Sequence, residues 1–266
     1  MQAADAPGTW RDVDPDNLVL IDTKYGETAV ELAPQFAPVH AARMRALVRA
    51  HFFDGTSFYR VIEGFVAQGG GNSDTPDPKW PTLKAEFDRP DGKDITFTPL
   101  GDPDLYAPEV GHVNGFPVGR DPKSGRVWIA HCPGTFAFGR DNGEDTASTE
   151  FYIVIGQAPR RLDRNLTAFG RVIWGMDDIE KLNRGDPDVG NGVIADPAKR
   201  DPIIRMRMAS DIPEEDRPKF QVMRTESPAF AAVKNQKRHP SKDFYQRPTP
   251  TNLDICLSMV PVRKVP

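Results

Sequence analysis

The stretch SFYRVIEGFVAQGG, residues Ser57–Gly70, decides how this sequence is interpreted. Its first half, SFYRVI, follows the turn Asp54-Gly55 and predicts an apolar β-strand over 57–62, with Arg60 inside it. Phe65 follows five residues after Arg60, and Gln68 comes just before two glycines. Because a strand that only builds a core rarely carries a guanidinium, the stretch indicates a surface that combines a cation, an aromatic ring and an amide.

The composition excludes several classes of partner. The chain has 266 residues, of which 38% are apolar, enough for a sizeable core. Its formal net charge is −4 with no dominant basic field, so we expect no nucleic-acid partner. No segment approaches the roughly 20 apolar residues that span a bilayer, so we expect no membrane insertion. Two cysteines and five histidines without ligand spacing predict no metal site.

Short apolar segments between glycine and proline turns predict a mainly β protein. The predicted strands cover residues 17–23, 27–32, 57–62, 83–88, 134–140, 149–156, 166–175 and 202–211. Helices are predicted at 38–50 and 176–185. Because the strands follow one another without a helix between each pair, they favour an eight-stranded antiparallel closed barrel capped by two helices over a doubly wound sheet.

The chain is expected to consist of one domain with additions. Residues 1–16 are predicted to be a flexible leader, and residues 17–211 form the barrel domain. A polar, glycine- and proline-rich insertion at about 91–126 is predicted to be a long loop within that domain. Residues 212–266 form a C-terminal extension that is predicted to have little structure of its own and to pack on the barrel.

The first residues, MQAADAPG, are typical of an exported protein whose signal peptide has been removed. We therefore expect a periplasmic or otherwise exported protein, with a cytoplasmic protein as the alternative. Cys132 and Cys256 leave two possibilities open. They form a disulfide, which an oxidising compartment allows, or they are two small buried thiols.

The opening stretch belongs to a longer pattern. Eight residues fit FxRxIxGFxxQGG, and GTFAFGRD (134–141), TEFYIVIG (149–156) and RLDRNLTAFGRV (161–172) follow in order. Together they resemble the cyclophilin family of peptidyl-prolyl cis–trans isomerases over about residues 17–211. The resemblance implies the cyclophilin-like barrel. It also implies an enzyme that isomerises X-Pro bonds of polypeptides, assists protein folding and needs no cofactor.

The resemblance also implies a role for each residue of the pattern. Arg60 would be catalytic, because a guanidinium that donates to the proline nitrogen weakens the amide resonance behind a barrier of roughly 18–20 kcal/mol. The residues expected to bind substrate are Phe65, Val66, Gln68, Gly139, Arg140, Glu150, Tyr152, Arg161, Leu162 and Leu166.

Five of these positions depart from the family's pattern. Glu150 stands where the family has glutamine, and Gly139 and Arg140 stand where it has alanine and asparagine. Arg161 replaces a tryptophan associated with drug binding, and Leu166 replaces a histidine. The departures predict an altered substrate preference and weak cyclosporin binding or none.

Two functions from different classes therefore stay open. The retained Arg60, Phe65 and Gln68 favour an active isomerase. The changed Arg140, Glu150 and Leu166, together with the extension, favour a cyclophilin-fold module that binds peptides or proteins with weak or no isomerase activity. Taken alone, an arginine in a strand is more often a surface residue. A third possibility, an unrelated hydrolase, is not supported, because the sequence contains no nucleophile–base pattern.

Overall fold

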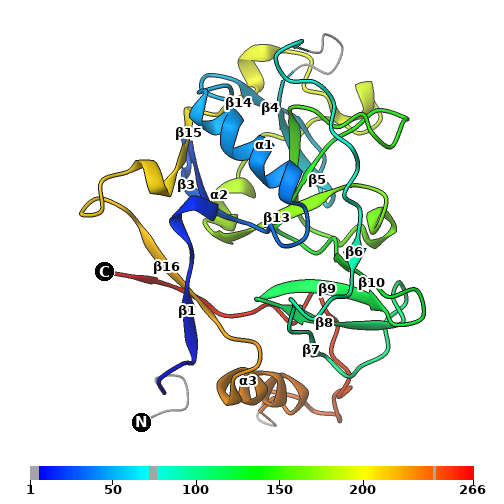
Figure 1. The fold of residues 1–266 in the computed structure, drawn as a ribbon. Helices are drawn as coiled ribbons and strands as arrows, with labels where there is room; N and C mark the ends of the chain where they lie inside the picture. Colours follow the sequence, from blue (N-terminus) through cyan, green and yellow to red (C-terminus); the bar gives the residue numbers. More distant parts are fainter. Residues whose placement is uncertain (1–5, 72–76, 242–243) are drawn as a thin grey trace. The chain divides into compact units, whose positions relative to one another are not determined.

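The computed structural model describes residues 6–71, 77–241 and 244–266. The chain folds into two units, each described by itself (Figure 1). The larger unit comprises Asp14–Arg89 and Ala130–Pro218. The smaller unit comprises Met1–Val13, Pro90–Ile129 and Lys219–Pro266.

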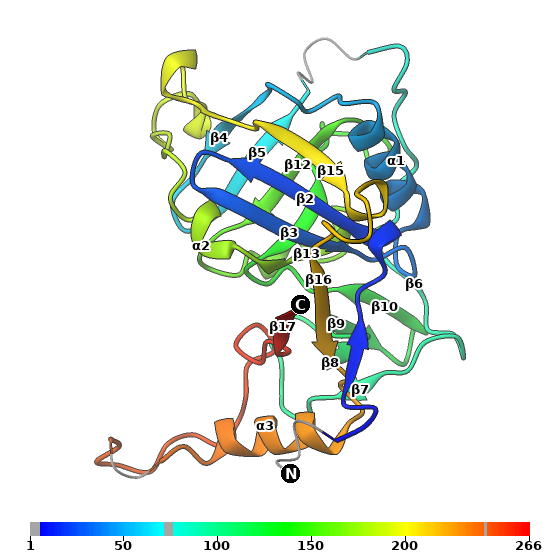
Figure 2. The same cartoon turned by 90° about the vertical axis from the view of Figure 1, so that its left-hand side faces the viewer.

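The larger unit is built on one nine-stranded antiparallel sheet with the order β14-β4-β5-β12-β11-β13-β3-β2-β15. In Figure 2, β2, β3 and β15 run in front of β4, β5 and β12, which shows that the sheet is curled rather than flat. Its strands are β2 (Leu18–Thr23), β3 (Gly26–Leu32), β4 (Ser57–Val61), β5 (Val66–Gly70), β11 (Thr135–Phe138), β12 (Glu150–Val154), β13 (Ala168–Trp174), β14 (Asp201–Pro202) and β15 (Arg205–Met208).

The mainly β class is confirmed, but the predicted closed eight-stranded barrel is wrong in strand number and in closure. The two edge strands, β14 and β15, are neighbouring parts of the segment 201–208. Within it, Ile203 N–H donates to the carbonyl of Thr56 (2.8 Å), next to β4, whereas Ile204 N–H donates to the carbonyl of Asp22 (2.9 Å) on β2. The chain thus crosses from one edge to the other instead of pairing with both edges as one strand.

The described residues contain three α-helices, one more than predicted. These are α1 (Pro38–Arg49) and α2 (Met176–Ile179) in the larger unit and α3 (Pro228–Arg238) in the smaller. α1 packs against β13 and β15, and α2 ends well before the predicted residue 185. Short 3-10 helices are η2 (Pro15–Asn17), η3 (Arg160–Leu162), η4 (Gly190–Gly192), η5 (Pro197–Lys199) and η6 (Ala209–Asp211).

One predicted strand of the larger unit is absent, and another strand was not predicted. Within 83–88 only Leu83 makes an isolated bridge, to Ala147. β5 lies in the second half of the opening stretch, where the glycines Gly69 and Gly70 hid the strand pattern.

The smaller unit contains two sheets, with the orders β1-β16-β17 and β6-β10-β9-β8-β7. Their strands are β1 (Trp10–Asp12), β6 (Arg89–Pro90), β7 (Thr98–Pro99), β8 (Glu109–Val113), β9 (Phe116–Asp121), β10 (Arg126–Ile129), β16 (Lys219–Met223) and β17 (Val262–Val265). The insertion is therefore not the predicted long loop, and the extension is not the predicted segment with little structure.

Both errors have identifiable causes. β8 and β9 form a hairpin around Asn114-Gly115, which have φ of 51° and 87°. Asn-Gly with positive φ is the strongest short hairpin signal, and the high polarity of the insertion masked it. In the extension, Ser227 caps α3 by accepting from Phe230 N–H (3.1 Å), followed by Pro228 at the first helical position.

Two other predictions concern the cysteines and the leader. Cys132 and Cys256 are both disulfide-bonded, so the second possibility, two small buried thiols, is wrong. Of the predicted flexible leader, residues 1–5 lie outside the described residues, and Trp10–Asp12 form β1.

Phenylalanine rings fill the interior of the curled sheet. The ring of Phe151 on β12 lies 5.4 Å from that of Phe53 and 5.1 Å from that of Phe136 on β11. All three side chains are fully buried. Because successive side chains of a strand point to opposite faces, Glu150 and Tyr152 on β12 are turned away from this aromatic core.

The N-terminus of α1 is capped from a distant segment. The N-cap residue Ala37 has no side-chain hydrogen bond. Instead, the carboxylate of Glu86 accepts from the backbone N–H groups of Val39 (3.1 Å) and His40 (3.0 Å) and lies 2.7 Å from Nδ1 of His40.

Replacing Glu86 by alanine is expected to lower the free energy of unfolding by about 1–2 kcal/mol, because two amides at the positive end of α1 lose their acceptor. Urea denaturation at pH 7 measures the change. Lys84→Ala, at an exposed position of the same segment, is the control and should change stability by less than about 0.5 kcal/mol. Equal effects of the two substitutions would contradict this role of Glu86.

Candidate active site

A β-bulge in β4 determines where Arg60 points. The register pairs Phe58 with Gly69, Arg60 with Gln68 and Val61 with Ala67, so two residues of β4 stand opposite one of β5. Phe58 and Val61 are both fully buried, although they are three residues apart. The extra residue breaks the alternation and lets the consecutive side chains of Tyr59 and Arg60 both reach Gln68.

The side chain of Gln68 is the centre of a hydrogen-bond network. Arg60 Nη1 donates to Gln68 Oε1 (3.0 Å). Gln68 Nε2 donates to the Tyr59 hydroxyl oxygen (2.6 Å) and to Glu150 Oε2 (2.7 Å), and the Tyr59 hydroxyl donates to that same carboxylate oxygen. A primary amide has two N–H donors. Both donors of Gln68 are therefore occupied by Tyr59 and Glu150.

Arg60 is also held from its other side. Its Nε donates to the backbone carbonyl of Asn191 (2.8 Å), a residue of η4 in the left-handed conformation, with φ of 54°. A guanidinium has five N–H donors. Two of them are used by Asn191 and Gln68, so three have no partner among the described residues. The group is thus fixed in orientation but keeps donors for a ligand.

Burial and the neighbouring groups set the charges of the site. Burial lowers the pKa of Arg60, while the nearby Tyr59 and Glu150 act in the opposite direction. Arg60 remains a cation, since a guanidinium is not deprotonated in proteins. Burial and then the charge of Glu150 raise the pKa of Tyr59 far above its ordinary value, so its hydroxyl stays a neutral donor.

Beside this network, on the same face of the sheet, lies a second, buried one. Tyr152, paired with Gln68 across β12 and β5, has its hydroxyl 3.0 Å from Nε2 of His131. Asp163 lies 3.1 Å from Nδ1 of His131 and accepts from Arg160 Nε (2.7 Å). Burial and the charge of Asp163 raise the pKa of Tyr152 well above its ordinary value. These contacts connect β12 to η3.

The remaining predicted residues differ in exposure. Val66 and Tyr152 are buried, whereas Phe65, Leu162 and Leu166 are half-buried and Arg161 is exposed. A Cβ built on Gly139 would stand 3.5 Å from Gln68 Nε2 and 3.7 Å from Glu150 Cβ. The structure therefore groups Arg60, Gln68, Glu150 and Gly139. Among the described residues, the side-chain bonds of Arg60 go only to Gln68 and Asn191, and none to Arg161 or Leu166.

Comparison with known proteins identifies the family. The profile described as "Cyclophilin type peptidyl-prolyl cis-trans isomerase/CLD" matches residues 18–208. The chain is a cyclophilin. A probable peptidyl-prolyl cis–trans isomerase of Brucella suis is 30% identical over 198 residues, 74% of this chain and 85% of its own length. Peptidyl-prolyl cis–trans isomerase B of Bacillus subtilis is 28% identical over 158 residues, 59% of this chain and 82% of its own.

A solved structure extends the similarity to nearly the whole chain. The crystal structure of cyclophilin AquaCyp293 from Hirschia baltica is 32% identical, with a TM-score of 0.79 over 99% of this chain and 95% of that one. The expected membership of the cyclophilin-type peptidyl-prolyl cis–trans isomerases is thereby confirmed.

Arg140 of this cyclophilin is tied to the backbone of two loops. Its Nε donates to the carbonyl of Asn165 (3.0 Å) and its Nη1 to that of Asp141 (2.7 Å), and its guanidinium lies 5.7 Å from the ring centroid of Phe87. These contacts join the loop after β11 to the loop that contains Leu166. Arg140 therefore links these two loops.

Several residues of the site were not predicted from the sequence. Tyr59 carried no separate signal, because its position depends on the bulge. His131 was not among the predicted site residues, and it is fully buried between Asp163 and Tyr152. The carbonyl of Asn191 comes from a loop more than a hundred residues away in sequence.

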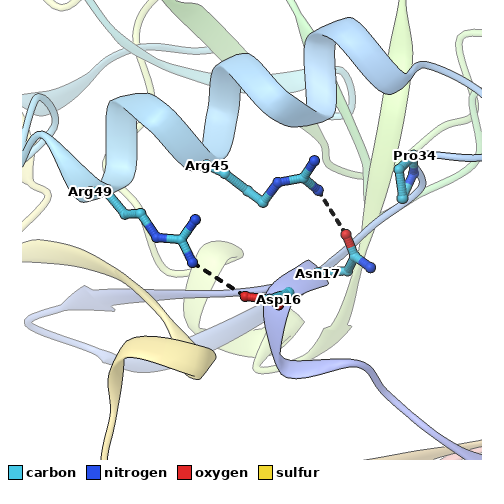
Figure 3. Close-up of a pocket in the computed structure, with 5 residues that line it drawn as sticks. All are labelled: Asp16, Asn17, Pro34, Arg45 and Arg49. Atoms are coloured by element: carbon cyan, nitrogen blue, oxygen red, sulfur yellow. Dashed lines mark hydrogen bonds and ion pairs between the residues drawn. The ribbon is translucent and has the colours of Figure 1, made fainter.

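A hollow of about 370 Å³ lies on the larger unit, lined by other residues (Figure 3). Figure 3 shows Arg45 and Arg49 of α1 pointing to Asn17 and Asp16. The Arg45 guanidinium donates to Asn17 (2.8 Å), and Arg49 forms ion pairs with Asp16 (3.2 Å) and Asp211 (3.1 Å). Its lining residues are Asp16, Asn17, Pro34, Arg45 and Arg49, and none of them belongs to the group around Arg60, so the hollow is not the candidate active site.

Two further observations concern the described part of the chain. It contains no group of three or more His, Cys, Asp or Glu side chains arranged to hold a metal ion. Nor does it contain a helix with the length and apolar character needed to cross a membrane.

Proposed function

We propose that this cyclophilin isomerises X-Pro bonds of protein substrates with Arg60 as the catalytic residue. The observation that carries the proposal is the guanidinium itself, which is fixed by Gln68 and Asn191 and keeps three N–H donors. A donor aimed at the proline nitrogen binds its lone pair only when the amide is twisted. Arg60 therefore stabilises the transition state more than the ground state.

The proline ring needs an apolar surface beside Arg60. We assign this surface to Phe65 and Leu162, which are half-buried and thus have area to offer a ligand. Val66 and Tyr152 are buried and support it from behind. Gly139 leaves room next to Gln68, because a side chain there would stand against its amide. The reaction requires neither covalent chemistry nor a cofactor.

We propose further that the substrates are exported proteins during folding and that the protein is periplasmic or otherwise exported. The disulfide-bonded state of Cys132 and of Cys256 supports this, since disulfides persist in oxidising compartments and are rare in the cytosol. A cytoplasmic location is the alternative. Fractionation of the source cells followed by immunodetection separates the two.

One observation favours a second candidate function, a peptide-binding module with weak or no isomerase activity. Both amide donors of Gln68 are taken by Tyr59 and Glu150, so Gln68 cannot hold a substrate carbonyl without giving one up. An NMR exchange assay on a panel of X-Pro peptides distinguishes the functions. The isomerase accelerates cis–trans exchange on at least some peptides, whereas the module binds peptide and leaves the uncatalysed rate unchanged.

Cyclosporin is expected to bind weakly or not at all. Arg161 stands where the family's drug-associated tryptophan is found, and its exposed side chain cannot supply both an indole N–H and a flat apolar face. Isothermal calorimetry should give a dissociation constant above about 1 μM, that is, weaker than about −8.2 kcal/mol. Arg161→Trp should tighten binding, and submicromolar binding by the unchanged protein would contradict the prediction.

A further inference from the structure

Glu150 occupies an unusual environment for a carboxylate. It is only 7% exposed, and its Oε2 accepts from both the Tyr59 hydroxyl and Gln68 Nε2. Burying a carboxylate is costly unless donors surround it. The two donors come from different strands, Tyr59 from β4 and Gln68 from β5. The carboxylate therefore joins the strands of the site.

A carboxylate at this position also determines which way the Gln68 amide faces. An ionised carboxylate only accepts hydrogen bonds, whereas an amide can both donate and accept. Glu150 can therefore face only the N–H side of Gln68. The Tyr59 hydroxyl, which gives its proton to Glu150, likewise accepts from that N–H side. A glutamine at residue 150, as in the family pattern, would allow either orientation.

The opposite end of the same amide holds the guanidinium. With Nε2 directed to Glu150 and Tyr59, Oε1 is the group that faces Arg60 Nη1 (3.0 Å). If the amide were reversed, N–H groups would face N–H groups and the hydrogen bond to Arg60 would be lost. The carboxylate of Glu150, the amide of Gln68 and the guanidinium of Arg60 thus form a chain of hydrogen bonds, and each hydrogen bond polarises and strengthens the next.

We propose that Glu150 and Tyr59 are positioning residues of the isomerase, which act through Gln68 to fix the guanidinium of Arg60. In consequence, Gln68 serves Arg60 rather than the substrate's backbone. This inference rests on the proposed catalytic role of Arg60 and deepens it. The glutamate at residue 150, where the family has glutamine, then fixes the orientation of the Gln68 amide. The change does not remove a substrate-binding group.

Kinetics of Tyr59→Phe and Glu150→Gln provide the first test. Each variant is expected to lower kcat about 5- to 10-fold, roughly the effect of one hydrogen bond, with KM within twofold of the parent. In the Arg60→Ala background, assayed at raised protein concentration, either change should have less than a twofold effect. Tyr245→Phe, a half-exposed tyrosine of the smaller unit, is the matched control and should leave kcat unchanged.

Three kinetic outcomes would overturn the inference. They are an unchanged kcat, a rise in KM alone, and a full effect that persists without Arg60. A rise in KM alone would show that Tyr59 and Glu150 bind substrate directly. A full effect without Arg60 would show that they act on the fold as a whole.

A second measurement does not depend on turnover. In ¹H–¹⁵N spectra of the unchanged protein, the two Nε2 protons of Gln68 should be resolved and should exchange slowly with solvent. Tyr59→Phe and Glu150→Gln should raise their exchange rate at least about tenfold, because one acceptor is lost or made ambiguous. Unaltered exchange would overturn the positioning role. If Arg60→Ala instead left isomerisation unchanged, the proposed catalytic role of Arg60 would be wrong, while these spectra would still report the orientation of Gln68.

Discussion

Arg60→Ala is expected to lower kcat/KM for X-Pro peptides at least about 100-fold while peptide affinity falls far less. Loss of a charged donor that acts on the transition state costs about 2.7–4 kcal/mol, and each 1.4 kcal/mol is tenfold in rate. The apolar contacts of Phe65 and Leu162 with the proline ring exist in the ground state as well, so they survive the substitution. A protease-coupled assay gives kcat/KM, and peptide titration followed by NMR gives the affinity.

Three further variants sharpen this result. Arg60→Lys keeps the charge but loses the planar fork that bonds both Gln68 and Asn191, so it should recover only a small part of the rate. Phe65→Ala should weaken affinity and kcat/KM together, because it removes binding that is uniform along the reaction. Arg45→Ala, which removes another arginine of the larger unit, should leave the rate unchanged.

The outcome also decides between the two functions. If the parent protein barely exceeds the uncatalysed rate on every peptide, there is no catalysed isomerisation for the Arg60→Ala substitution to slow. Arg60→Ala would then alter only the affinity for a partner. In that case the enzyme proposal is abandoned in favour of the binding module.

The coarse fold could be predicted from the sequence because its signals are local. The short apolar segments at 149–156 and 134–140 predict strands, and the structure has β12 and β11 there. Closure could not be predicted in this way. Whether the segment 201–208 pairs with one edge, with both, or crosses between them depends on the curvature of the whole sheet, which no local pattern specifies.

The candidate site likewise contains some residues that could be predicted from the sequence and others that could not. Arg60 and Gln68 are fixed by a long sequence pattern, and the structure brings their side chains together. Tyr59 was not predicted, because simple alternation places consecutive side chains on opposite faces, and only the bulge brings both Tyr59 and Arg60 to Gln68. His131 and Asp163 are 32 residues apart in sequence and meet only through the tertiary fold.

Asp163→Ala is expected to lower the free energy of unfolding by about 3–5 kcal/mol, although Asp163 was not among the predicted site residues. The side chains of Arg160, Asp163 and His131 are 4%, 6% and 0% exposed. Removing the carboxylate takes away the acceptor of Arg160 Nε and the partner of His131 Nδ1, both of which are buried, and breaking a buried ion pair by removing one partner is costly. Guanidinium chloride denaturation at pH 7 measures the loss. Asp88→Ala, which breaks a pair with the half-exposed Arg164, is the control and should cost less than about 1 kcal/mol.

The pH dependence of the free energy of unfolding provides a second, independent test of this prediction. Burial alone would raise the pKa of Asp163, but the hydrogen bond from His131 and the charge of Arg160 outweigh it and hold that pKa below its ordinary value. A carboxyl group with a lowered pKa in the folded state stabilises the protein above its unfolded pKa of about 4, and this stabilisation is lost as the pH falls through the folded value. The difference in stability between the parent and Asp163→Asn should therefore be constant from pH 7 to about 5 and shrink below about 4. A difference that stays constant to pH 2 would mean that Asp163 contributes by its shape rather than its charge. The coupling of η3 to Tyr152 would then have to rest on packing alone.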